Sequence, residues 1–114
     1  MLAVGGQVLN RLDPQWVRMT TGFAGGVGGT HQELCGALSA GIMVIGGLYG
    51  RNTLEEDDSR ALDLATRYRK RFLTELGQTQ CSPLYERVHA AGGPGSCSFV
   101  VERAVRILLD LLSE

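Results

Sequence analysis

The sequence has no CxxC pair, no apolar stretch of membrane-spanning length and no strong excess of charge of either sign. Its three cysteines, Cys35, Cys81 and Cys97, lie far apart. This spacing fits neither a zinc ribbon nor a thioredoxin motif. Secreted disulfide scaffolds carry denser, usually even-numbered cysteines. The opening residues, MLAVGGQVLNRLD, lack the basic start and apolar core of a signal peptide, so we expect a cytoplasmic protein.

A net charge of -1 gives no field that would select nucleic acid or a membrane surface. The longest uncharged run, LCGALSAGIMVIGGLYG at residues 34–50, falls short of the ~20 residues that span a bilayer. We interpret it as a buried helix and expect neither a membrane span nor a nucleic-acid partner. A length of 114 residues suits one domain, residues 1–114.

Glycine is present in excess, at 16 of 114 residues, about twice the usual share of about 7%. The stretch GFAGGVGG, residues 22–29, predicts a backbone that bends or approaches another segment closely. A nucleotide loop is disfavoured, because no strand precedes it and GxGxxG is absent. We expect the loop to pack on the central helix, with backbone N–H groups facing a bound sulfur or cluster at Gly25, Gly26, Gly28 and Gly29.

Helix signals run along the whole chain, and no strand alternation is present. Thr30 with Glu33 and Thr53 with Glu56 are capping-box patterns. They start helices that we expect to continue to about Tyr49 and to Leu76. The expected helices cover residues 4–12, 14–21, 31–49, 54–76, 82–91 and 97 or 98–112. The fold class is therefore all-α: a compact bundle of four to five helices around the glycine-rich, apolar central helix.

Side-chain spacing indicates which faces are solvated or buried in the helices expected at residues 54–76 and 97 or 98–112. Glu56 with Arg60 and Asp63 with Arg67 are i,i+4 ion pairs on a solvated face. In the last helix, the residues expected to face the core are Phe99, Val101, Val105, Leu108 and Leu112.

Each cysteine lies near an expected helix start. Helix N-termini present free N–H groups and partial positive charge, which stabilise a thiolate and lower a cysteine pKa. Thiolate is both a nucleophile and a soft metal ligand. In the alternative interpretation, each cysteine is a small hydrophobic residue buried in the core.

His31 and Cys35 are four residues apart and would share one helix face. With Cys81 and Cys97 they would form a Cys3His set suited to zinc or an iron–sulfur cluster. In the alternative interpretation, His31 is a polar residue in an exposed first helical turn.

The stretch CGALSAG fits CGAxxG, follows the glycine-rich segment and precedes single cysteines at Cys81 and Cys97. This order resembles the C_GCAxxG_C_C family of redox-active proteins over about residues 20–112. The resemblance implies redox activity, with Cys35, Cys81 and Cys97 matching the last three of the family's four cysteines. The first cysteine is missing, and Val4 stands at about its place unless the N-terminal part is truncated. A four-thiolate site would then need His31, water, a substrate or a partner subunit.

Three hypotheses follow. In the first, two of the three cysteines cycle between dithiol and disulfide with a redox partner, in electron transfer or thiol exchange. Cys97 attacks first because it lies nearest a helix start. In the second, the same cysteines and His31 bind a metal or an iron–sulfur cluster. In the third, the cysteines are inert in a structural or assembly protein. A homodimer sharing the apolar central helix is expected and is compatible with all three.

Overall fold

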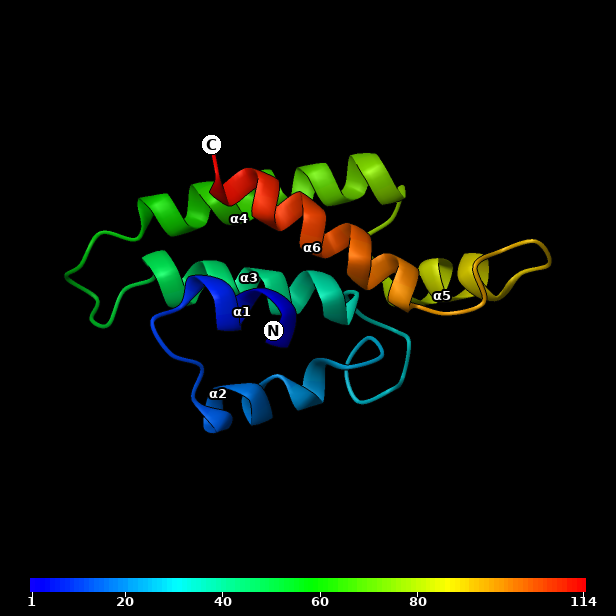
Figure 1. Cartoon of the computed structure of the whole chain (residues 1–114), viewed down its shortest axis with the longest axis horizontal. Coiled ribbons are helices and arrows are strands. Elements are labelled where there is room, and N and C mark those ends of the chain that lie inside the picture. Colours follow the sequence, from blue (N-terminus) through cyan, green and yellow to red (C-terminus); the bar gives the residue numbers. More distant parts are fainter.

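Six α-helices and one short 3₁₀ turn form the chain in the computed structural model, which describes residues 1–114 (Figure 1). No strand is present, so the all-α prediction is confirmed. No helix is both long and apolar enough to cross a membrane. In chain order the elements are α1 (Leu2–Val8), α2 (Pro14–Met19), the 3₁₀ turn η1 (Thr21–Phe23), α3 (Gly36–Tyr49), α4 (Ser59–Leu76), α5 (Cys81–His89) and α6 (Ser98–Leu112).

Helices α3, α4 and α6 pack against one another and enclose the core, while α1 packs on α3 and α6 (Figure 1). Helix α4 contributes a stripe at intervals of four residues, which is one helical face: Leu64, Tyr68, Phe72 and Leu76, all buried. Tyr68 and Phe72 are among the largest fully buried side chains. The central position of α3 agrees with its apolar sequence, because it is covered by helices on several sides.

The end of α4 is fixed by local backbone geometry and by a contact from α5. Gly77 ends the helix in the left-handed conformation, with a φ of 78°, as glycine at this position commonly does. The Arg87 guanidinium donates a 2.6 Å hydrogen bond to the Leu76 carbonyl oxygen. This bond satisfies one of the free carbonyl groups at the helix end and ties α5 to α4.

Two helices begin later than their capping-box patterns predict. Helix α3 begins at Gly36, not at His31. The Thr30 hydroxyl does not cap it, because this oxygen lies 2.9 and 2.8 Å from the carbonyl oxygens of Gly26 and Val27. The intervening residues form a bend and a backbone bridge to the segment before α5.

Helix α4 begins at Ser59, not at Leu54. The Asp57 carboxylate accepts a 2.9 Å hydrogen bond from the Ser59 N–H and so acts where the Thr53 pattern was expected to act. The predicted Glu56–Arg60 helical pair is therefore wrong, since residue 56 precedes the helix. The Asp63–Arg67 pair is present at 3.5 Å.

The apolar face of α6 is wider than the surface that the neighbouring helices cover. Val100, Ala104 and Leu108 are buried in the core. Phe99 and Val101, which were expected there, are 40% and 47% exposed. That part of the prediction is wrong, because the α3–α4 pair meets α6 along a neighbouring stripe. Val101 lies instead on the wall of an open cavity.

Gly41 allows the close approach of α3 and α4, because a Cβ placed there would lie 2.5 Å from the Tyr68 hydroxyl oxygen. We predict that Gly41→Ala lowers the free energy of unfolding by about 1–3 kcal/mol through overpacking. The control is Gly46→Ala on the same helix, where a Cβ meets nothing within 4 Å. It should raise stability by about 0.5–1 kcal/mol, because alanine favours helix. Urea denaturation under reducing conditions measures both, and equal effects would contradict the close packing.

Candidate functional site

Cys35 and Cys81 are positioned by an isolated antiparallel bridge between the segments that precede α3 and α5. The Cys35 N–H donates to the Thr79 carbonyl oxygen at 2.8 Å, and the Cys81 N–H donates to the Glu33 carbonyl oxygen at 2.9 Å. These two bonds hold the starts of α3 and α5 side by side.

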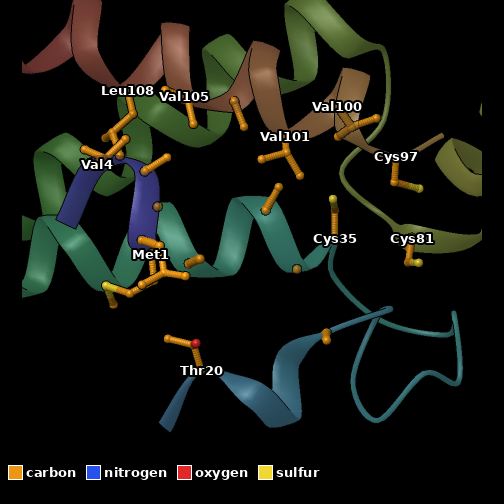
Figure 2. A pocket seen from close by; sticks show the side chains of 18 of the residues that line it. Met1, Val4, Thr20, Cys35, Cys81, Cys97, Val100, Val101, Val105 and Leu108 are labelled. Carbon is orange, nitrogen blue, oxygen red and sulfur yellow. The ribbon is translucent and has the colours of Figure 1, made fainter. Parts of the chain in front are cut away.

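All three cysteines line one cavity of about 620 Å³ (Figure 2). Cys35 and Cys97 are the residues that immediately precede α3 and α6, and Cys81 is the first residue of α5. The predicted placement at helix starts is thus confirmed. The three thiols are free and differ in access: Cys97 is exposed, Cys35 is half-buried and Cys81 is buried. Three helix starts that are distant in sequence thereby bring their sulfurs to one region.

His31 contacts Cys81, not Cys35. The segment from His31 to Cys35 is not helical, so the predicted shared helix face is wrong. His31 has a left-handed backbone with a φ of 61°, which is uncommon for a residue with a side chain. Its Nδ1 lies 3.6 Å from the Cys81 Sγ. Its ring meets the Tyr85 ring edge-on, with centroids 4.3 Å apart.

The glycine-rich loop meets the start of the central helix α3, where a Cβ at Gly36 would lie 3.4 Å from the Ala24 Cα, and it also packs against Cys81 of α5, which was not predicted. Gly25, Gly26, Gly28 and Gly29 all have positive φ. A Cβ at Gly26 would lie 2.5 Å from the Cys81 Cβ, so only glycine fits without a shift. The Gly28 and Gly29 N–H groups donate within the loop, to Gly22 and Ala24 carbonyl oxygens. These two groups are therefore engaged, while a ligand role for Gly25 and Gly26 stays a prediction.

For the thiols of Cys35 and Cys81, the effect of burial on the pKa is larger than the effect of the helix N-terminus. Burial raises the pKa of the Cys35 thiol, and the N–H groups of Ala37 and Leu38 lower it by a smaller amount. Burial also raises the pKa of Cys81, and charge on Cys35 or Cys97 raises it further. The expectation that a helix start lowers the thiol pKa is therefore wrong for these two. The expected effect of a helix start is still present at Cys35, where backbone N–H donors lower the pKa and so oppose the effect of burial.

The rest of the cavity is apolar, with two tyrosines near the thiols. No Asp, Glu, Lys or Arg side chain lines it. Tyr68 lies in its wall, and burial followed by charge on Cys35 raises the pKa of this phenol. Tyr85 was not among the predicted site residues. A signal for Tyr85 was available, because it follows Cys81 by four residues and so shares its helix face.

A metal centre is not preformed by these side chains. No three residues among His, Cys, Asp and Glu lie close enough together to hold one ion. Of the predicted Cys3His set, His31 and Cys81 form a close pair. The other two members, Cys35 and Cys97, line the same cavity.

The contact between the glycine loop and Cys81 predicts a difference between Gly26→Ala and Gly28→Ala. Both substitutions force a left-handed alanine, at about 1–2 kcal/mol each. Only the Cβ at residue 26 meets Cys81, since a Cβ at residue 28 meets nothing within 4 Å. We expect faster alkylation of Cys81 in Gly26→Ala because the loop must move off the thiol. In Gly28→Ala the rate should stay unchanged. Peptide mass mapping measures this, and equal rates would contradict the contact.

The raised pKa values of Cys35 and Cys81 predict a pH dependence. Their folded values exceed the unfolded value of about 8.5, so burial of the neutral thiols contributes stability in full below that pH. This contribution is lost as the pH rises through the folded values. We expect alkylation of both cysteines to increase with midpoints above about 8.5. The free energy of unfolding should fall over the same alkaline range. Midpoints at or below about 8.5 would contradict burial as the dominant effect.

The family model described as "Putative redox-active protein (C_GCAxxG_C_C)" matches residues 1–111. The match also covers α1 and α2, which precede the region of about residues 20–112 that resembles the family. No curated protein and no solved structure matches the chain. Val4, at about the place of the missing first cysteine, is buried in the core, and Figure 2 shows it at the opposite end of the cavity from the three thiols. On the match over residues 1–111, the chain belongs to the C_GCAxxG_C_C family.

Proposed function

We propose that the protein exchanges electrons with a partner by reversible formation of a disulfide between two of its three cysteines. One observation carries the proposal: three cysteines from three separate helix starts line one cavity while remaining free thiols. A purely structural cysteine needs only a tight apolar site. The shared cavity instead brings the three thiols to one site, and formation of an intramolecular disulfide requires a second thiol there.

In the proposed reaction Cys97 attacks first, because it is the exposed thiol. Its thiolate attacks one sulfur of the partner's disulfide, and the partner's other sulfur leaves and is protonated. Cys35 then attacks the Cys97 sulfur, and the partner's remaining sulfur leaves as a second thiol. The protein gains a Cys35–Cys97 disulfide, and the partner receives two electrons and two protons.

Charge on Cys97 raises the pKa of both Cys35 and Cys81, so this effect does not distinguish the two thiols. Backbone donors support Cys35 as the second thiol of the pair, because the Ala37 and Leu38 N–H groups act on its sulfur and favour its thiolate. No comparable backbone donor acts on Cys81. Cys81 instead contacts His31, so we assign it a place beside the pair.

Metal or iron–sulfur binding is the second candidate, and the 3.6 Å contact between His31 and Cys81 favours it. Thiolate and imidazole together are ligands that zinc and iron accept. Cys35 and Cys97 would have to move toward this pair to complete a site, since no three ligands are gathered. A structural role with inert cysteines is the third candidate. The proposed setting is a reducing cytoplasm, with a redox partner protein and a second copy of the chain.

Mild oxidation of the reduced protein with oxidised glutathione tests the proposal. We expect free thiols to fall from three to one, with a Cys35–Cys97 cross-link found by peptide mapping. Cys81→Ala should fall from two to none. Cys35→Ala should stop at a mixed disulfide of glutathione with Cys97, because the second thiol of the pair is missing.

Three other results would contradict this scheme. Thiols that stay unreactive until the chain unfolds would indicate the structural role. Stoichiometric zinc, or iron with visible absorption, after anaerobic purification would favour the metal site. A cross-link between Cys81 and Cys97 in the unaltered protein would retain the redox function and overturn the assigned pair.

A further inference from the structure

The cavity that contains the thiols is large for so small a protein. Its volume of about 620 Å³ lies in the range of about 300–1,000 Å³ that small-molecule sites occupy. Protein interiors are otherwise packed as densely as organic crystals. Twenty of the 25 lining residues are hydrophobic. A hollow of this size and character is suited to a ligand larger than water.

Small residues on one helix face create this space. Gly36, Ala37, Ala40 and Gly41 of α3 form one wall, and larger apolar residues of α6, including Val101, form the opposite wall (Figure 2). No Asp, Glu, Lys or Arg side chain lines the cavity. Its basic groups are His31, which contacts Cys81 at the thiol end, and the amino group of Met1, whose pKa burial lowers. Along the apolar remainder of the wall a charged ligand would lose its hydration without gaining a counter-ion, so the wall favours an uncharged ligand with an apolar body.

The reactive groups occupy one end of the cavity. Figure 2 shows Cys35, Cys81 and Cys97 together at the ends of their helices, while Val4, Val105 and Leu108 lie toward the other end. A bound molecule with its body among the apolar residues would therefore present one end to the thiols. This arrangement is typical of a substrate site, in which binding contacts and reacting groups are separated.

We propose that the cavity binds an uncharged, apolar small-molecule disulfide and presents its sulfur pair to Cys97. This inference rests on the proposed function and names its substrate class. The Cys97 thiolate attacks one substrate sulfur, the substrate S–S bond breaks and one thiol leaves. Cys35 attacks Cys97, the mixed disulfide breaks and the second thiol leaves. Both protons come from the two cysteines, and the substrate is reduced by two electrons.

A matched pair of disulfides tests the selection by charge. Dipropyl disulfide and dithiodipropionate have chains of equal length, but the second carries two carboxylates. The ratio of their rates of protein oxidation is compared with the same ratio for mercaptoethanol, a neutral thiol without a binding site. We expect the protein to favour the neutral disulfide by at least roughly tenfold more than mercaptoethanol does. An equal ratio would overturn the proposal.

Two variants, each with a control, locate the selection in the cavity. Ala40→Leu fills the hollow and should lower the rate with dipropyl disulfide roughly tenfold, whereas Ala91→Leu outside the cavity should not. Val101→Lys adds a cation at a partly exposed wall position and should raise the rate with the dianion. Leu62→Lys, exposed on α4, should leave it unchanged. A folded Val101→Lys variant without this change would contradict the proposal even if Ala40→Leu fails to fold.

Binding without chemistry separates this inference from the proposed function. In the Cys35→Ser/Cys97→Ser double variant, calorimetry should detect binding of dipropyl disulfide but no binding of dithiodipropionate. Introducing Ala40→Leu into this double variant should abolish the binding signal. Exchange in the unaltered protein without such binding would retain the function and overturn the cavity proposal. If Val101→Lys halves the solution mass, a second copy of the chain occupies the cavity and the proposal is wrong.

Discussion

The site depends on two backbone hydrogen bonds, from the Cys35 N–H to Thr79 and from the Cys81 N–H to Glu33. They hold the segments before α3 and α5 together, although 46 residues separate the two cysteines along the chain. Because these bonds use extended backbone, α3 starts only at Gly36, and its first N–H groups lie at the Cys35 sulfur. The bridge thus sets the distance between the starts of α3 and α5. It also determines which backbone N–H groups act on the Cys35 thiol.

Local sequence signals predicted the helices whose ends depend on local contacts. Helix α2 starts at Pro14 as expected, with the Asp13 side chain accepting a 2.8 Å bond from the Gln15 N–H, and α4 ends at Leu76 as expected, before Gly77. Both capping-box signals failed. At Thr53 the nearby Asp57 acts instead and α4 starts later, and at Thr30 the bridge between Leu34 and Gln80 keeps the following residues extended. A contact of this kind is not visible in any short window of sequence.

The site was predictable in its members and not in its geometry. The family pattern and the helix starts identified the three cysteines, and the glycine excess indicated close packing, which occurs at Gly26 against Cys81. The direction of the thiol pKa shifts was not predictable, because burial depends on how α3, α4 and α6 meet. The partner of His31 was missed for the same reason: its backbone turns left-handed and reaches Cys81, 50 residues away.

The arrangement of the cysteines has a consequence for the order of events during biosynthesis. In the unfolded chain Cys81 and Cys97 are 16 residues apart, whereas Cys35 and Cys97 are 62 apart. Closing the shorter loop loses less chain entropy, so oxidation before folding would favour the Cys81–Cys97 pair. The folded chain removes this bias by burying Cys81 behind the glycine loop. For the proposed Cys35–Cys97 disulfide to form, newly made protein would therefore have to stay reduced until it has folded.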